Sequence, residues 1–183
     1  MGAVPSPPTP RGSTDDRRDP GVARALIIGC GRRGRALGSR LVADGWQVRG
    51  TTRFEESRAA IEAEGIEAAV ADPDRPGTLL DLIGDVTVVH WLLGGADGPP
   101  PLLDAIHGPR LQALLERLVD TPVRGFVYEA AGGAGDEYLR RGAATVRFAA
   151  DTWRIPVEIV EADPSEPDQW LEAMVTATGR LVG

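Results

Sequence analysis

Apolar residues occur along the chain in short continuous runs that alternate with amphipathic stretches. Residues 25–28 are apolar throughout, as is typical of a strand buried on both faces of a sheet. Residues 35–44 have helical spacing, with Leu37 and Leu41 on one face, and Gly45 marks the end of this helix. The same alternation predicts further strands at 47–52, 68–71, 86–93, 125–129 and 157–160, and further helices at 55–64, 77–83, 111–119, 137–153 and 169–181.

These elements amount to six strands, each followed by a helix. The pattern predicts an α/β protein with a doubly wound, six-stranded parallel sheet in the order 3-2-1-4-5-6 and helices on both faces. The glycine- and proline-rich residues 94–110 are expected to form a loop. The predicted domain takes up residues 22–183, so no separate substrate domain is expected.

Residues 1–21 differ in composition from the rest of the chain. They contain five prolines and almost no apolar residues. Such a segment cannot bury enough surface to offset its conformational entropy, and we expect a disordered tail. The alternative is a proline-rich arm that binds a partner.

Composition excludes several classes of protein. All 20 Lys/Arg positions are arginine, which rules out a Schiff-base lysine, a P-loop lysine and a Tyr-Lys catalytic pair. A net charge of -7 argues against nucleic-acid binding. The sequence has no apolar run long enough to span a membrane and no signal-peptide core. With Cys30 as the single cysteine, we expect a cytoplasmic protein without disulfides or a cysteine-based zinc site.

The strongest motif is a glycine loop between the first strand and the first helix. Residues 29–34 read GCGRRG and fit the pattern G-x-G-x-x-G. The first glycine would permit a tight turn, the second a close approach to a pyrophosphate, and the third close packing of helix on strand. The helix N-terminus would offer free N–H groups to the anion. The alternative is a glycine-rich turn in a domain that binds nothing. The predicted cofactor-binding residues of this loop are Gly29, Gly31, Arg32, Arg33 and Gly34.

The end of the second strand favours NADP(H) over NAD(H). NAD sites usually place an acidic residue there to bind the ribose 2′-hydroxyl. Here the strand ends in Thr52 and Arg53, with no acid before Glu55, and a guanidinium suits a 2′-phosphate. Residues 22–58 carry eight arginines and three acidic residues, whereas residues 59–183 have a net charge of -12. The local positive charge would attract an anionic cofactor. The alternative is a solvated polar loop.

Three segments carry a resemblance to a known family. The stretches IIGCGRRGRALGSRLVADGWQVRGTTR, VTVVHWLLGG and RGFVYEAAGG resemble atypical short-chain dehydrogenases/reductases of the NAD-dependent epimerase/dehydratase kind. The resemblance covers nearly all of the chain after the tail, although only the first stretch is specific. It implies a Rossmann fold that binds NAD(P). It also implies that residues 92–95, with Leu92 and Leu93, run under the nicotinamide ribose and that residues 128–132 border the nicotinamide.

The chain departs from this family at the catalytic positions. The paired serines that commonly end the fifth strand are replaced by Ala130 and Ala131. Tyr138 is followed four positions later by Gly142, where the family has lysine. No catalytic residue can therefore be assigned, and Tyr128 and Glu129 are only weak candidates. Glu129 is either an acid of raised pKa or, as we favour, a helix cap or an acceptor for a backbone amide.

The remaining candidates have simpler interpretations. His90 is expected to be a core histidine, and His107 a loop or cap residue. Cys30 is expected to pack in the core, with redox sensing as the alternative. Asp97 is placed near the mouth of the predicted cleft. The acidic residues between 163 and 168 are expected to form turns, and no metal site is predicted.

These observations give three hypotheses. The first is a cytoplasmic NADP(H)-binding, oxidoreductase-like protein that transfers hydride to or from a small-molecule substrate without the Ser/Tyr/Lys set. The second is a non-catalytic NADP(H) redox sensor or regulatory binding module. The third is an assembly protein with a vestigial site, in which helices 111–119 and 141–153 could support a homodimer.

Overall fold

The computed structural model describes residues 22–183, so the predicted tail at 1–21 lies outside the described residues. A single six-stranded sheet has the order β3-β2-β1-β4-β5-β6, and every neighbouring pair of strands is parallel, as predicted. The strands are β1 (Arg24–Ile28), β2 (Gln47–Thr52), β3 (Glu67–Val70), β4 (Val88–Trp91), β5 (Gly125–Glu129) and β6 (Val157–Val160).

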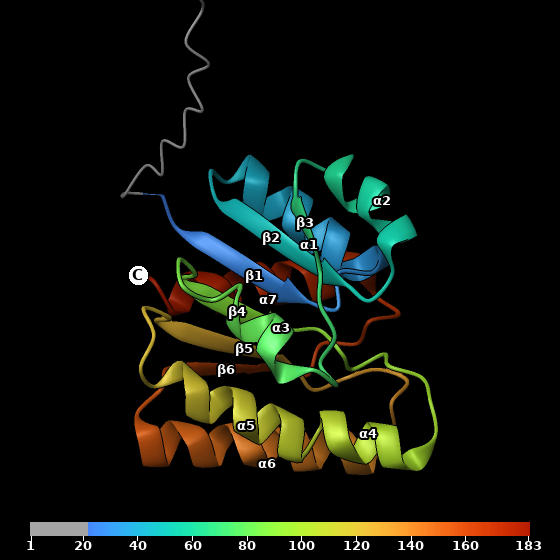
Figure 1. Ribbon diagram of the computed structural model, residues 1–183, viewed down its shortest axis with the longest axis vertical. Helices are drawn as coiled ribbons and strands as arrows, with labels where there is room; N and C mark the ends of the chain where they lie inside the picture. Colours follow the sequence, from blue (N-terminus) through green and yellow to red (C-terminus); the bar gives the residue numbers. More distant parts are fainter. Residues whose placement is uncertain (1–21) are drawn as a thin grey trace, which may run out of the picture.

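Helices cover both faces of this sheet (Figure 1). One face carries α1 (Arg32–Ala43), α2 (Arg58–Glu62), which continues from a short 3-10 turn (Glu55–Ser57), and α7 (Pro167–Arg180). The other carries α3 (Pro76–Leu80), α4 (Pro100–Ile106), α5 (Pro109–Leu118) and α6 (Asp136–Trp153). Within residues 22–183, none of the helices combines the length and the apolar character needed to cross a membrane.

Helix α4 corrects the prediction of a continuous loop at 94–110. Proline is tolerated in the first turn of a helix because the first N–H groups have no partner within the helix, and two prolines begin α4. Leu103 and Ile106 supply its buried face. The prolines that indicated a loop therefore mark the start of a helix.

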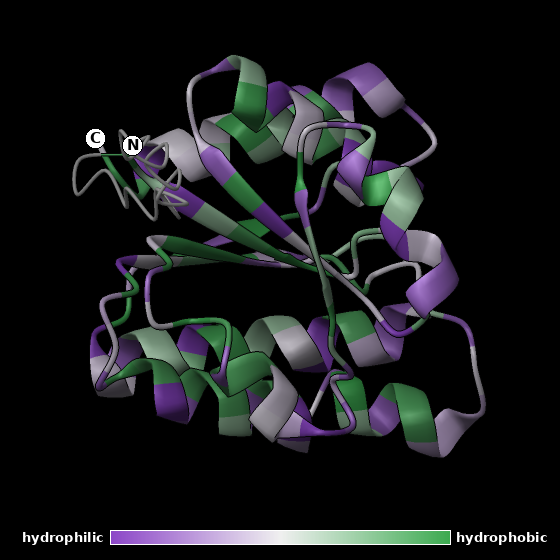
Figure 2. Cartoon of the chain, turned by 45° about the horizontal axis from the view of Figure 1, so that its top comes forward, coloured by the Kyte–Doolittle hydropathy of each residue, from purple (hydrophilic) through white to green (hydrophobic). Residues whose placement is uncertain are grey.

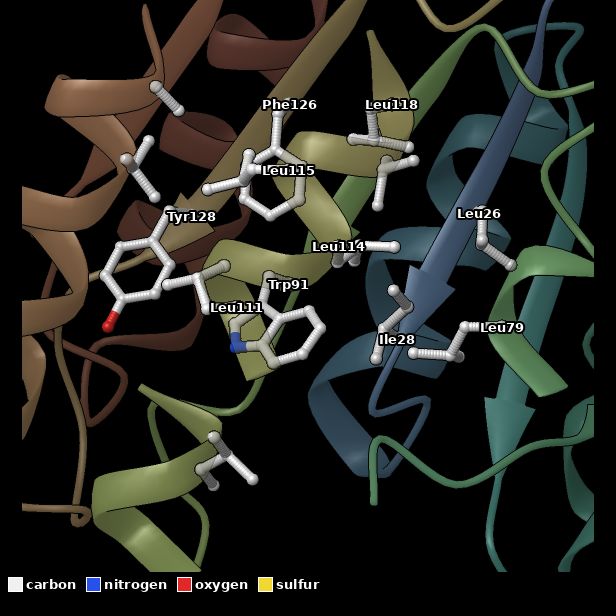
Figure 3. Close-up of a cluster of buried hydrophobic side chains, with 14 of the residues drawn as sticks. Leu26, Ile28, Leu79, Trp91, Leu111, Leu114, Leu115, Leu118, Phe126 and Tyr128 are labelled. Atoms are coloured by element: carbon white, nitrogen blue, oxygen red, sulfur yellow. The ribbon is translucent and has the colours of Figure 1, made fainter. Parts of the chain in front are cut away.

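The hydrophobic core lies in two layers, one on each face of the sheet. Leu26 and Ile28 of β1 face the α5 and α6 side, where Trp91 and Phe126 also lie (Figure 3). Ile27 belongs to the opposite layer, against α1 and α7. Figure 2 shows hydrophobic residues gathered along the central strands and alternating with hydrophilic ones on the helices. This is the pattern that two-sided burial requires of a parallel sheet.

The two-residue repeat of β5 decides where its last side chains lie. Phe126 and Tyr128 belong to the core layer under α5 and α6, whereas Val127 belongs to the layer under α1 and α7. Glu129, two residues after Val127, hydrogen-bonds Arg33 of α1 and Trp170 of α7. Since successive residues of a strand point to opposite faces, Tyr128 and Glu129 lie in different layers of the protein.

Candidate functional site

A cavity of about 830 Å³ opens at the carboxyl ends of the strands. Its walls come from the segments that follow β1, β2, β3 and β4. Strand β1 lies between β2 and β4, where the strand order reverses, and open α/β sheets bind their ligands outside such a point. All nine residues predicted to bind cofactor line this cavity, namely Gly29, Gly31, Arg32, Arg33, Gly34, Thr52, Arg53, Leu92 and Leu93.

The three glycines of the loop have separable structural roles. Gly29 has φ +88°, and a Cβ there would lie 2.7 Å from the Leu92 carbonyl oxygen. A Cβ on Gly34 would lie 2.9 Å from the Gly29 carbonyl oxygen. These two positions therefore require glycine for the turn and for the close packing of α1. Gly31 is exposed, with φ -75°, and a Cβ there would meet open space.

The end of β2 holds the glycine loop in place. The Cys30 N–H donates to the Thr51 carbonyl oxygen at 2.9 Å, and the Gly29 N–H donates to Thr51 Oγ1 at 3.3 Å. No side chain caps α1, and its first turn contains no acidic residue. The N–H groups of this first turn therefore lack a side-chain acceptor, and residues 31–34 line the cavity.

Two exposed arginines add positive charge to the cavity. Arg53 lies over the Phe54 ring, 5.4 Å from its centroid, and the Phe54 N–H donates to Thr52 Oγ1 at 3.2 Å. Among the ion pairs between described residues, none involves Arg32 or Arg53. Their charge is therefore available to a ligand.

Sequence reasoning missed several residues that line the same cavity. Among them are Phe54, Glu56, Asp72 and Asp74. The two aspartates follow β3, which lies beside β2. Their position at the carboxyl end of a neighbouring strand is the signal that could have identified them. Asp97, which was placed near the cleft mouth, also lines the cavity.

Tyr128 is fully buried on the face of the sheet away from α1. Its hydroxyl lies 2.8 Å from Nδ1 of His107, and burial raises its pKa above the ordinary value. His107 caps the C-terminus of α4, as a cap residue was expected to. Tyr128 is not among the described residues that line the cavity. Its hydroxyl is therefore not placed to donate a proton to a ligand there.

Glu129 is buried and accepts three hydrogen bonds. Its Oε1 accepts from Nε of Arg33 and from Nε1 of Trp170, both at 3.1 Å, and it forms an ion pair with Nη2 of Arg33 at 3.0 Å. Its Oε2 accepts from the Gly94 N–H at 2.9 Å, which confirms the favoured prediction of a backbone-amide acceptor. Burial raises the pKa of Glu129, and the nearby Arg33 opposes this effect. Glu129 is absent from the described lining of the cavity, while its partner Arg33 belongs to it.

Two further predictions from the sequence are confirmed. His90 is a core residue whose Nε2 lies 2.8 Å from Thr178 Oγ1, and burial lowers its pKa to about 4. Cys30 is buried, and its burial raises the thiol pKa to about 12, so the unreactive protonated form persists. Within residues 22–183, no group of three His, Cys, Asp or Glu side chains is placed to hold a metal ion.

By sequence, the chain matches no protein-family model and no curated protein. Its structure resembles UDP-glucose 4-epimerase with UDP-glucose from Thermotoga maritima, with 12% identity and a TM-score of 0.66, over 75% of this chain and 54% of that one. It also resembles UDP-glucuronic acid 4-epimerase in complex with NAD from Bacillus cereus (15% identity, TM-score 0.62, 76% and 56% of the two chains). A third neighbour is triphenylmethane reductase complexed with NADP(H) from Citrobacter sp. (18% identity, TM-score 0.58, 75% and 48%).

The fold is therefore a Rossmann-like α/β fold, shared with NAD(P)-dependent epimerases and reductases. The chain spans about half the length of these neighbours. At such identities the likeness shows the fold, and the function must be argued from the site itself.

Proposed function

We propose that this protein binds NADP(H) in the cavity at the carboxyl ends of β1, β2 and β4. One observation carries the proposal: nine residues predicted from three separate segments line a single cavity at the point where the strand order reverses. The open space at Gly31 and the uncapped N-terminus of α1 fit a diphosphate. The exposed arginines Arg32 and Arg53 fit further phosphate charge.

We further propose that the protein is a reductase-like enzyme acting on a small-molecule acceptor. Bound NADPH would supply hydride, and the chain's own residues would bind and orient the cofactor. Among the described residues, none at the end of β5 lines the cavity. The two residues that follow Glu129 there are Ala130 and Ala131, which have no proton to donate. No side chain is assigned as the proton donor; the proton would come from water, and the protein's contribution would be positioning and electrostatics.

The burial of Tyr128 and Glu129 favours a second candidate function. Both catalytic candidates are held in hydrogen bonds within the protein, and neither lines the cavity. A protein that binds NADP(H) without turnover would act as a redox sensor. Such a sensor must bind the oxidised and reduced forms with different affinities, because equal affinities shift no equilibrium. Turnover of NADPH with an acceptor separates the enzyme from the sensor.

Arg53→Ala is expected to weaken binding of NADP+ and NADPH about 10- to 100-fold while leaving NAD+ and NADH within about twofold. The reason is that a charge-assisted hydrogen bond contributes about 1.5–3 kcal/mol, and the 2′-phosphate is present only in the NADP forms. Isothermal titration with all four dinucleotides measures the effect.

Arg117→Ala is the matched control for this test. Arg117 is an exposed arginine on α5, outside the cavity lining, so the variant has the same change in net charge. Equal losses for NAD and NADP forms in Arg53→Ala would contradict the 2′-phosphate assignment. No dinucleotide binding by the wild-type protein would overturn the proposed function.

A further inference from the structure

Arg33 connects the glycine loop to two cavities and to the last strands of the sheet. Its guanidinium hydrogen-bonds Glu129 and lies over the Trp170 ring, 5.7 Å from the centroid. Besides the main cavity, it lines a second one of about 450 Å³ beside residues 131–133 and 163–165. Among the described residues, only Arg33 and Pro164 line both cavities. A ligand that extends from one cavity into the other therefore lies beside Arg33.

The two partners of the ion pair differ in their freedom to move. The Arg33 side chain is 33% exposed, whereas that of Glu129 is 1% exposed. Arg33 can turn toward a ligand or solvent, while Glu129 stays inside the protein. If the Arg33 guanidinium moved away, the buried Glu129 carboxylate would keep only neutral hydrogen-bond donors, and this state is strongly destabilised.

The neutral groups around Glu129 come from three further elements. The Gly94 N–H donates from the segment after β4, and the Trp170 N–H donates from α7. Strand β6 places Val160 beside Glu129 in the register of the sheet. Tyr128, the neighbouring residue in β5, belongs to the other face. Among the described contacts, Arg33 is thus the one charged group that faces this carboxylate.

An anionic ligand at the N-terminus of α1 acts on this pair in two ways. Its diphosphate attracts the Arg33 guanidinium, which lies on the first turn of the same helix. The negative charge of the ligand also disfavours the ionised form of the nearby Glu129. Both effects favour the neutral form of Glu129, whose pKa burial already raises.

We propose that Glu129 is a positioning residue that couples ligand binding to the uptake of a proton. In the ligand-free protein its carboxylate holds Arg33 at the junction of the two cavities. When a nucleoside diphosphate ligand draws Arg33 away, the carboxylate accepts one proton from solvent and becomes a neutral carboxylic acid. No other bond forms or breaks, and no electron is transferred. This inference rests on the proposed dinucleotide site and adds a proton to its binding reaction.

A ligand-free experiment tests the coupling first. Arg33→Met imitates the state in which Arg33 has left, since it keeps an unbranched apolar stem against Trp170. In this variant the folded-state pKa of Glu129 would lie above the unfolded value of about 4.3. A carboxyl of raised pKa lowers stability as pH rises through the interval between these two values. Urea unfolding should therefore show that Arg33→Met is less stable than the wild type and that this difference increases with pH. Between pH 5 and 8.5, the ratio of the two folding equilibrium constants should change at least about tenfold.

Two variants make this result specific. Arg33→Met combined with Glu129→Gln should lose the pH dependence, because no carboxyl remains to titrate. Arg40→Met removes a guanidinium from an exposed ion pair on the same helix and should show a loss that stays constant with pH. A loss in Arg33→Met that stays constant over this pH range would overturn the coupling.

Calorimetric titration with NADP+ at pH 8.0 tests whether ligand binding is accompanied by proton uptake. At this pH the ligand's 2′-phosphate is fully ionised, since a phosphate monoester has its second pKa near 6. Comparing HEPES with Tris, buffers of different ionisation enthalpy, gives the number of protons taken up. We expect net proton uptake in the wild type, to an extent set by the pKa of Glu129 in the complex, and close to none in Glu129→Gln. Binding without proton uptake would overturn the coupling and leave the proposed function standing, whereas no binding at all would overturn both.

Discussion

Gly31→Asp is expected to weaken dinucleotide binding at least about 100-fold while leaving the free energy of unfolding unchanged or slightly raised. Gly31 is the N-cap of α1 with extended backbone angles, and a side chain there meets open space. Aspartate is among the best N-cap residues, so the helix loses nothing. Its carboxylate would lie where the diphosphate is proposed to bind, and like charges in contact cost several kcal/mol. Isothermal titration and urea unfolding measure the two effects.

Gly31→Ser is the matched control for the charge. Serine also caps helices through a side-chain oxygen, but it is smaller than aspartate and neutral. It should bind dinucleotides within about tenfold of wild type, because the main penalty of aspartate is electrostatic. If Gly31→Asp binds as tightly as Gly31→Ser, the diphosphate does not lie at the N-terminus of α1.

The largest expected loss of stability is for Gly142→Ala, at about 3 kcal/mol. Gly142 lies in α6, where alanine would ordinarily stabilise a helix by about 1 kcal/mol over glycine. Here, however, a Cβ would overlap the hydroxyl and ring of Tyr128, which is fully buried. Overpacking of a dense core commonly costs about 1–3 kcal/mol, occasionally more, and a shift of Tyr128 would also disturb its hydrogen bond to His107. Urea unfolding should show a lower midpoint with an unchanged slope.

Two comparisons isolate the clash. Gly179→Ala in α7 adds a methyl group in open space and should be neutral or stabilising. Tyr128→Phe removes the closest overlapping atom, so Gly142→Ala should cost less in that background than in the wild type. Tyr128→Phe alone should lose about 1–2 kcal/mol, because His107 Nδ1 loses its partner, and should leave dinucleotide binding unchanged. A Gly142→Ala variant as stable as Gly179→Ala would show that the core accommodates the extra methyl.

The amino-acid sequence by itself determined the strand order and the glycine loop. Continuous apolar runs reveal strands that are buried on both faces, and the handedness of βαβ connections leaves few topologies for alternating strands and helices. Residues 29–34 form a turn and a helix start within one short segment, so local glycine chemistry is enough to predict them. Thr52 and Arg53 followed from the end of the adjacent strand, and both line the cavity.

Only the tertiary structure decided where the side chains of the other candidate residues lie and which partners they bind. Alternation along β5 shows that Tyr128 and Glu129 point to opposite faces, but it cannot show which face carries α1. The partner of Arg33 lies 96 positions away in the sequence, at the end of β5. Trp170, which shares that carboxylate, comes from α7. Local patterns encode local structure, whereas a buried ion pair between distant segments exists only once the sheet and helices have brought them together. For this reason Glu129, a weak candidate in the sequence, became in the folded protein the residue that holds Arg33.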